Sequence, residues 1–464
     1  MNGRTLRVVG GTLIDGTGGK PLEDSLIHVV DGRIRAIGRR GDFPVMPEGT
    51  VIDATGRYVL PGFMNGNVHL LDGIMMMGKG GVEYLARFEG RLHEVIEESA
   101  QVALKGGCTT VFDTWNALMP ILKARDRINA GKAAGARIFA AGNIVGMGGP
   151  FSADFMMQAR SVISTTFADR MDRLFDAGVG RWLSTLTPEE VRPLIRDYLA
   201  HGVDMLKVAV SDHLIGLLGW KSPYLTFSER VLRVIVEETR RAGLPLLTHT
   251  LSVESLNLAV EFQADVMIHA TITSQHPIPE ALLRRIVDGP GWSEIQPTTH
   301  DYQDHLELTQ HPWTGYAGGA HDENTLRMIR AGAKIILGTD AGCTDPDILH
   351  DLPPEELTDR PWTLGADHIV WMKAMVEKGM RSMDAIQACT ANVAKAYRQD
   401  RDYGTLEVGK VADLLVVHDD PLADVTNASK LVAVIKDGVP VDIGRLPDPP
   451  LVTRYPRDAD FSRE

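Results

Sequence analysis

Five short apolar runs along this chain each end in, or contain, a side chain able to bind a metal or move a proton. They are Gly66-Asn67-Val68-His69, Met205-Leu206-Lys207-Val208, Leu247-Thr248-His249-Thr250, Met267-Ile268-His269-Ala270 and Leu337-Gly338-Thr339-Asp340. Imidazole and carboxylate groups are good ligands for zinc, cobalt and manganese. A single histidine at a strand end is more often a hydrogen-bonded core residue, so it is the ordered set that predicts a divalent-metal site.

Lys207 differs from the other candidates because it lies inside an apolar run. A lysine there could extend its ammonium group to the surface. Apolar neighbours on both sides favour burial instead, and an ammonium group buried alone is costly. Pairing with a carboxylate or carboxylation by CO₂ would each remove that cost, so we expect Lys207 to belong to the site.

These side chains can meet only if parallel strands carry them to one edge of a sheet. Strand candidates alternate with helical patterns such as residues 227–242, which open with the capping-box sequence Thr226-Phe-Ser-Glu229. The strand candidates are residues 58–68, 109–113, 136–142, 204–210, 244–249, 265–270, 294–297 and 334–340. We predict an α/β fold, a (β/α)₈ TIM barrel, whose active sites lie at the carboxyl ends of the strands. A doubly wound open sheet is the alternative, but no G-x-G-x-x-G motif follows the first strand.

Both ends of the sequence show short strands broken by glycine-containing turns. Asp31-Gly32 between two apolar runs predicts a hairpin, and similar strands return at residues 412–417 and 432–439. We therefore predict a composite β-sandwich domain from residues 1–60 and 403–446. The barrel then occupies residues 61–402, and residues 447–464 form an extended tail.

Composition argues against several classes of partner. The net charge of the 464 residues is −13 and no lysine- or arginine-rich block occurs, which disfavours nucleic acid and anionic membranes. No apolar stretch approaches the length of a membrane span, and the first residues lack a signal-peptide layout. Three widely spaced cysteines fit a reducing compartment, so we expect a cytoplasmic protein.

The chain resembles the metal-dependent amidohydrolase superfamily over nearly its full length. The matching segments are VIDATGRYVLPGFMNGNVHL (51–70), LLTHT (246–250), VMIHA (266–270), ILGTDAG (336–342) and GTLEVGKVADLLVV (404–417). Members usually carry His-x-His on the first strand, where this chain has Asn67-Val68-His69. In this respect it is similar to a subgroup that includes phenylurea hydrolases and the thiocarbamate (molinate) hydrolase. The resemblance also implies a homo-oligomer.

Asn67 has a consequence for the metal, because an amide oxygen is a weaker ligand than imidazole. We expect one ion per subunit, zinc or cobalt with manganese possible. His249, His269 and a carboxylated Lys207 could hold it. Alternatively His69, His249 and Asp340 hold it, with Asn67 beside them, and His269 polarises the substrate carbonyl.

The predicted reaction is hydrolysis by metal-activated water, with Asp340 as the group that moves the proton and His269 as the preferred oxyanion stabiliser. Substrate preference belongs to the loops after the strands, which are apolar here. We predict a pocket for a small apolar substrate lined by Met76, Trp115, Phe151, Met156, Trp220 and Tyr224. A urea- or carbamate-type carbonyl of the phenylurea kind is the leading substrate. A thiocarbamate follows, then a dipeptide or cyclic amide, and a non-catalytic barrel scaffold is the competing class.

Overall fold

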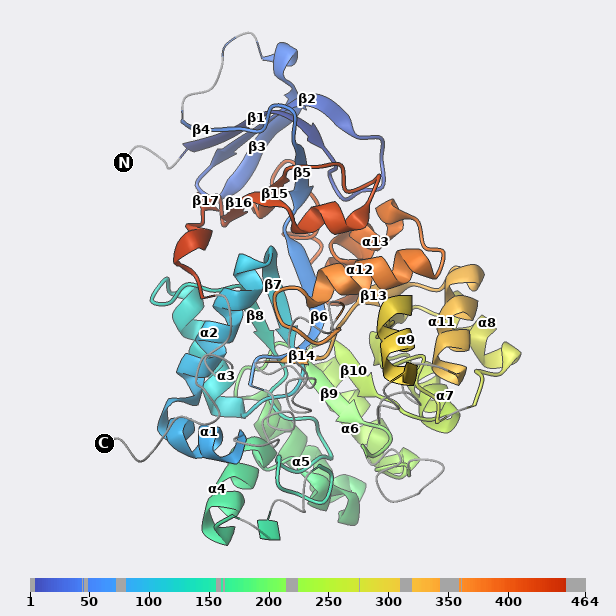
Figure 1. Ribbon diagram of the computed structural model, residues 1–464. Helices are drawn as coiled ribbons and strands as arrows, with labels where there is room; N and C mark the ends of the chain where they lie inside the picture. The colour runs from blue at the N-terminus through green and yellow to red at the C-terminus, as the bar shows by residue number, and fades with distance from the viewer. Residues whose placement is uncertain are drawn as a thin grey trace.

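A parallel barrel with a mixed, mainly antiparallel sheet over one end forms the protein in this computed structural model (Figure 1). The structure describes residues 5–43, 45, 49–71, 81–155, 160–161, 163–213, 224–274, 276–308, 319–342, 359 and 361–447. The fold is therefore α/β, as the alternation of strands and helices predicts.

The mixed sheet combines strands from both ends of the chain, and all of its pairs are antiparallel except those of β1 with β4 and with β5. Its order is β17-β16-β15-β5-β1-β2-β3, and β4 pairs with β1. The bounds are β1 Thr5–Leu13, β2 Leu22–Val30, β3 Arg33–Arg39, β4 Thr50–Asp53, β5 Tyr58–Pro61, β15 Leu414–Val417, β16 Leu431–Lys436 and β17 Val439–Pro440. Val8, Ile27 and Val416 share one apolar cluster, so the two ends of the sequence bury a common core.

The turn between β2 and β3 is the one that the sequence predicts. Asp31 and Gly32 both adopt positive φ angles, 50° and 77°. That pair of left-handed residues suits a two-residue hairpin, because its twist matches the twist of the strands.

The barrel consists of two parallel arcs that join at both seams. One arc is β14-β6-β7-β8 and the other is β13-β12-β11-β10-β9. The strands are β6 Phe63–His69, β7 Cys108–Asp113, β8 Arg137–Ala140, β9 Leu206–Ala209, β10 Leu246–His249, β11 Val266–Ile268, β12 Trp292–Ile295, β13 Ile335–Leu337 and β14 Ala341–Gly342.

Backbone hydrogen bonds close each seam. The Val145 N–H donates to the Lys207 carbonyl (2.8 Å) and the Ala209 N–H donates to the Val145 carbonyl (2.9 Å), which joins the first arc to β9. At the other seam, β14 follows β13 along the chain and pairs in parallel with β6 through Ala341 and Val68. The strands therefore form one ring, and their carboxyl ends all lie at the same end of the barrel.

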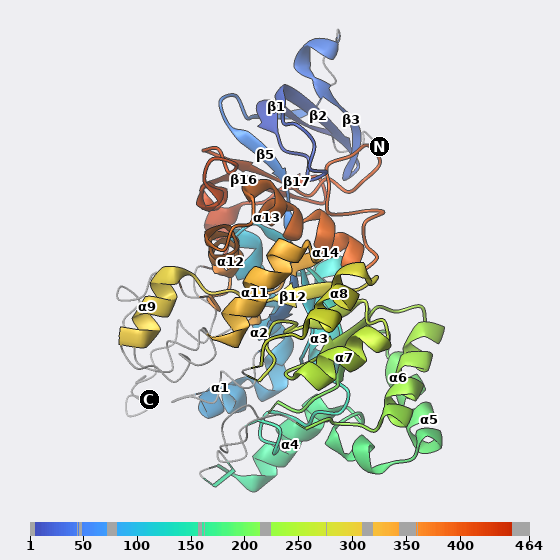
Figure 2. The same cartoon turned by 90° about the vertical axis from the view of Figure 1, so that its right-hand side faces the viewer.

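Helices surround the barrel in both views (Figures 1 and 2). Their bounds are α1 Gly81–Phe88, α2 Leu92–Lys105, α3 Leu118–Asn129, α4 Thr165–Asp176, α5 Pro188–Leu199, α6 Glu229–Arg241, α7 Val253–Glu261, α8 Glu280–Asp288, α9 His300–Leu308, α11 Ala320–Ala331, α12 Asp367–Glu377, α13 Ser382–Ala388 and α14 Ala391–Ala396. Within the described ranges, no helix has the length and apolar character needed to cross a membrane.

Two sequence predictions differ from the structure in detail. The expected strand over residues 58–68 is divided at Gly62 into β5 and β6, which belong to different sheets. A Cβ at Gly62 would lie 2.3 Å from Thr109 Oγ1, so only glycine fits this crossing. Helix α6 begins after Ser228, whose side chain accepts the Val231 N–H, so Thr226 is not its N-cap.

Candidate active site

Asp340 is the centre of a side-chain cluster at the carboxyl ends of the barrel strands. Its Oδ1 lies 2.7 Å from Asn67 Nδ2 and 3.1 Å from His69 Nε2, and its Oδ2 lies 3.7 Å from His269 Nε2. The rings of His269 and His249 meet edge to face with their centroids 5.0 Å apart. Donors that are separated by up to 273 positions in the sequence thus form one group.

Two members of this cluster have left-handed backbone conformations. The φ angles are 61° for His269 and 57° for Asp340, a region that non-glycine residues seldom adopt. The Asp340 N–H donates to the Asn67 carbonyl (2.9 Å), and the His269 N–H donates to Glu294 Oε2 (2.7 Å). These bonds hold both residues where the strands turn into loops, and they aim both side chains at the cluster.

Burial and the neighbouring side chains together determine the ionisation of the cluster. Burial alone would raise the pKa of Asp340, but His269, His69 and Lys207 together lower it well below its ordinary value. Burial lowers the pKa of His269 to about 3 and the pKa of His249 well below its ordinary value. The result is an ionised carboxylate beside two neutral imidazoles, and these are the forms that bind a metal.

Several ring nitrogens of the cluster are buried with no hydrogen-bond partner in the described part of the chain. They are Nδ1 and Nε2 of His249 and Nδ1 of His69. Buried polar atoms without partners are costly, and a cation would satisfy them. The donor set therefore fits a divalent ion in its chemistry and its unsatisfied atoms. Its spacing differs, because no three His, Cys, Asp or Glu side chains of the described residues stand at metal-ligand spacing, and Asp340 pairs with Asn67 and His69.

Lys207 reaches the cluster through a hydrogen-bonded chain. Its Nζ donates to Thr114 Oγ1 (3.0 Å), and the Thr114 hydroxyl donates to Asn67 Oδ1 (2.5 Å). Asn67 is thereby fixed with its oxygen toward Thr114 and its nitrogen toward Asp340. Lys207 is fully buried, and burial lowers its pKa, which Asp340 and Glu294 only partly oppose.

Glu294 is a site residue to which the sequence analysis gave no role. It is completely buried on β12, and burial together with the charge of Asp340 raises its pKa to about 8. A Cβ at Gly338 would lie 2.3 Å from Glu294 Cγ, so the glycine of the ILGTDAG segment makes room for this carboxyl group. The available signal was a charged residue in a predicted strand. The same kind of signal identified Lys207.

A second overlooked residue is His213, in the segment after β9. Its ring stacks against that of His249 at 5.6 Å, and burial lowers its pKa to about 4. No metal-binding or catalytic motif marks this position in the sequence, so His213 was not predicted as a site residue.

Aromatic rings form one continuous wall beside the cluster. Centroid separations are 5.7 Å from His69 to Trp115, 4.8 Å from Trp115 to Phe155, 5.0 Å from Phe155 to His213 and 5.6 Å from His213 to His249. We call these five residues the aromatic arc. It runs from one candidate metal ligand to another, so a substrate at the metal would contact it.

The structure describes three of the six residues that were predicted to line the pocket, and they differ in burial. Trp115 is buried within the aromatic arc. Phe151 is also fully buried, and its ring contacts Phe167 of α4 at 5.9 Å, whereas Tyr224 is 52% exposed. Met76, Met156 and Trp220 lie outside the described residues.

Two arginines in the long loops are already paired. Arg160 forms ion pairs with Asp169 and Asp172, and Arg181 forms one with Asp154 (2.7 Å). A substrate carboxylate would have to compete with these aspartates for either guanidinium group.

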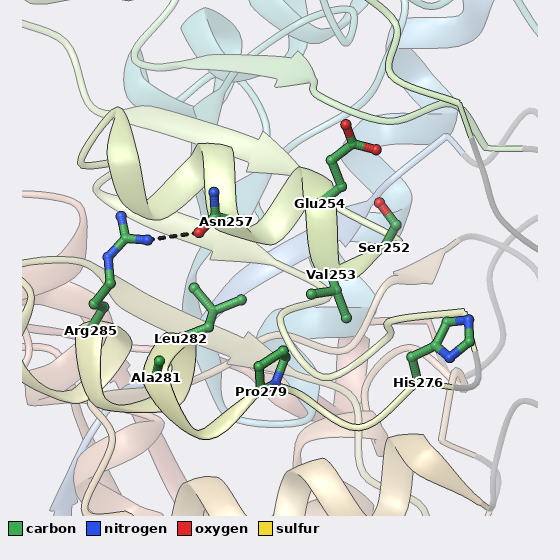
Figure 3. A pocket seen from close by; sticks show the side chains of 9 residues that line it. All are labelled: Ser252, Val253, Glu254, Asn257, His276, Pro279, Ala281, Leu282 and Arg285. Carbon is green, nitrogen blue, oxygen red and sulfur yellow. Dashed lines mark hydrogen bonds between the residues drawn. The ribbon is translucent and has the colours of Figure 1, made fainter.

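A separate surface pocket of about 560 Å³ lies between α7 and α8 (Figure 3). Its walls include Val253, Leu282 and Pro279, and Arg285 donates to Asn257 across it (2.7 Å). It contains none of the strand-end donors. We therefore place the chemistry at the cluster around Asp340 and not in this pocket.

Solved structures similar to this chain share nearly its whole length. The structure of molinate hydrolase is 59% identical, covers 99% of both chains and superposes with a TM-score of 0.94. The structure of phenylurea hydrolase B is 49% identical, covers 97% of this chain and all of that one, and has a TM-score of 0.93. A Xaa-Pro dipeptidase, at 22% identity and a TM-score of 0.71, shares the fold.

Curated relatives match shorter segments. Adenine deaminase of Rubrobacter xylanophilus is 41% identical over 66 residues, 14% of this chain and 11% of that protein. Dihydroorotase of a Thermoanaerobacter species is 37% identical over 111 residues, 24% of this chain and 21% of that protein. This chain thus matches 21% or less of the length of each. The amidohydrolase family model, in contrast, matches residues 58–441. The chain therefore belongs to the amidohydrolase family.

Proposed function

We propose that the protein is a metal-dependent hydrolase that cleaves a urea- or carbamate-type carbonyl bond in a small apolar molecule. The observation that carries this proposal is the cluster around Asp340, where an ionised carboxylate and neutral imidazoles converge beside the aromatic arc. The likeness to molinate hydrolase and phenylurea hydrolase B supports it.

His69, His249 and Asp340 are the residues that would hold the metal. The histidines carry buried ring nitrogens without partners among the described residues, and Asp340 supplies the negative charge. Asn67 carries an amide in place of an imidazole, and Thr114 and Asp340 already engage its oxygen and nitrogen, so this position offers no strong ligand for a second ion. We propose one ion per subunit, zinc or cobalt with manganese as a third choice. Such a cation supplies a Lewis acid and lowers the pKa of water toward neutrality.

Asp340 and His269 have complementary roles in this proposal. Asp340 is ionised at neutral pH and accepts a proton from the attacking water, then passes it to the leaving group. His269 is neutral and donates a hydrogen bond to the oxygen that becomes negative. The two side chains are 3.7 Å apart, so one substrate carbonyl can contact both.

The aromatic arc supports an apolar substrate. Trp115 and Phe155 give it a buried aromatic surface against which an aryl or alkyl group can pack. For a phenylurea, hydrolysis gives an aniline, CO₂ and an alkylamine. A thiocarbamate, which releases a thiol, is the second candidate and is favoured by the 59% identity to molinate hydrolase. The ion pairs of Arg160 and Arg181 disfavour a dipeptide, whose carboxylate needs a free cation.

We also infer a cytoplasmic homo-oligomer with neither nucleic acid nor membrane as partner. The inference comes from the net charge of −13, the cysteine spacing and the family resemblance.

The test combines metal analysis with substrate profiling. Purified protein is analysed for zinc, cobalt and manganese, and turnover is measured on phenylureas, thiocarbamates and dipeptides before and after chelation. We expect about one ion per subunit and chelator-sensitive hydrolysis of the first or second class. A folded protein that binds no metal and cleaves none of them would support the scaffold reading instead.

A further inference from the structure

We propose that Gln296 is a positioning residue that determines which ring nitrogen of His269 carries the proton. Its amide group keeps Nδ1 unprotonated, so Nε2 carries the hydrogen and acts as a donor toward the reacting centre. The inference deepens the proposed function, because it assigns His269 to the substrate oxygen and not to the metal.

The geometry begins with the position of Gln296 directly after β12, the strand that neighbours the one ending at His269. Glu294 and Gln296 are two positions apart, so in an extended strand their side chains point to the same face. Glu294 Oε2 accepts the backbone N–H of His269 (2.7 Å), and Gln296 Nε2 lies 2.9 Å from His269 Nδ1. Both side chains are buried, at 0% and 4% exposure. Glu294 therefore fixes the backbone of His269, and Gln296 fixes its ring.

The contact between Gln296 and His269 has one direction. An amide nitrogen can only donate, so Nδ1 must be the acceptor, and a neutral imidazole that accepts at Nδ1 carries its proton on Nε2. Glu294 Oε2 is 3.7 Å from Nδ1, too far for a competing hydrogen bond. Gln296 therefore decides the tautomer.

The consequence appears at the other side of the ring. His269 Nε2 faces Asp340 Oδ2 at 3.7 Å, so the proton points into the strand-end cluster. An N–H group there stabilises a developing oxyanion, but it has no lone pair to offer a cation. The metal ligands are then His69, His249 and Asp340, which resolves the choice between the two ligand sets that the sequence left open.

The direct test is nitrogen NMR of the metal-free protein labelled with ¹⁵N-histidine, with His269 assigned from a His269→Asn sample. We expect the wild-type His269 signals of a ring that is protonated at Nε2 and unprotonated at Nδ1. Gln296→Glu removes the donor and presents an acceptor, so the pattern should reverse. A wild-type ring protonated at Nδ1, or a pattern that Gln296→Glu leaves unchanged, would overturn the proposal.

Kinetics provide the second readout. Replacing a residue that hydrogen-bonds to a histidine of a metal site commonly lowers activity or metal affinity by about 10- to 100-fold. We expect Gln296→Glu and Gln296→Met to lower kcat by about that factor with little change in KM, with Glu the more severe. Gln101→Glu, on α2, is the control. If Gln296 only filled space, Gln296→Met would match wild type, which would contradict the proposal even if Gln296→Glu fails to fold.

Failure of the proposed function can be distinguished from failure of the Gln296 assignment, because the NMR experiment uses neither metal nor substrate. If no urea, carbamate or thiocarbamate is cleaved but the tautomer pattern holds, the proposed substrates are wrong and the assignment to Gln296 remains.

Discussion

The amide nitrogen of Asn67 donates a 2.7 Å hydrogen bond to Oδ1 of Asp340. Asn67 cannot rotate freely, because Thr114 donates to its oxygen from the other side. Asn67 therefore orients the carboxylate of Asp340. Under the proposed function, an asparagine that supports the proton-transferring group occupies the position where the family resemblance implies a metal-binding histidine.

Replacing Asp340 with Asn should remove turnover per bound metal ion while the fold remains, and the metal content should fall as well, because Asp340 is one of the three proposed ligands. The amide cannot accept a proton from water, and general-base groups contribute about 10²- to 10⁴-fold. The measurements are kcat, circular dichroism and metal content, with Asp126→Asn on α3 as the control. Near-normal turnover would exclude Asp340 from the proton-transfer role.

Asn67→His should raise the metal content from about one ion per subunit toward two, because it restores the strong ligand that members of the family usually carry. Equilibrium dialysis followed by elemental analysis measures the change, with Asn257→His on α7 as a surface control. Unchanged stoichiometry would show that something other than the ligand blocks the second position.

Glu294 should make the metal-free protein less stable as pH rises through about 8. Its folded pKa is raised to about 8, so the folded state favours the neutral acid. The stabilising contribution is fully present below its ordinary pKa and is lost as pH rises through the folded one. We expect Glu294→Gln to match wild type in thermal unfolding near pH 5 and to exceed it near pH 9. If the melting temperatures of wild type and Glu294→Gln changed in parallel between these pH values, the raised pKa of Glu294 would be contradicted.

Lys207 should react with CO₂. Its lowered pKa increases the fraction of neutral amine, which is the form that adds to CO₂ to give a carbamate. Protein equilibrated with ¹³C-bicarbonate should show a carbamate carbon signal that Lys207→Met lacks. Lys378→Met is a matched control, because Lys378 is buried but paired with Asp322. A signal that survives Lys207→Met would place the modification elsewhere.

Phe155→Leu should raise KM for aryl substrates by about 2- to 10-fold and change kcat little. A buried aromatic pair contributes about 0.5–1.5 kcal/mol beyond the area that it buries. Phe175→Leu is the control, because Phe175 contacts Trp115 at 5.2 Å but is not part of the aromatic arc. Equal effects of the two variants on KM would show that Phe155 stabilises Trp115 and does not contact substrate.

The sequence predicted the strand-end donors because barrel geometry constrains them. His69, His249 and Asp340 each end or follow an apolar run, and parallel strands bring all such ends together. The division at Gly62 has a local signal that the strand prediction passed over, because Pro61 and Gly62 together interrupt residues 58–68. The close approach of Thr109, 47 positions later in the chain, explains why a glycine stands there.

A second group of residues could not be predicted because their contacts depend on the order of the strands in the barrel, which no local sequence pattern encodes. These residues are Glu294, Gln296 and His213. Gln296 becomes informative only once β12 lies beside β11 and its amide meets His269. Residues that act through another side chain carry less signal in a sequence than the ligands themselves.

The mixed sheet has a consequence for synthesis of the protein on the ribosome. Leu60 of β5 pairs with Leu415 of β15, so the amino-terminal strands emerge hundreds of residues before their partner does. Until then, β5 presents an unpaired edge to other nascent chains, the kind of surface that aggregates. Chaperone capture during translation should therefore concentrate on this segment, and ribosome-bound intermediates that stop before β15 should aggregate more than the released chain.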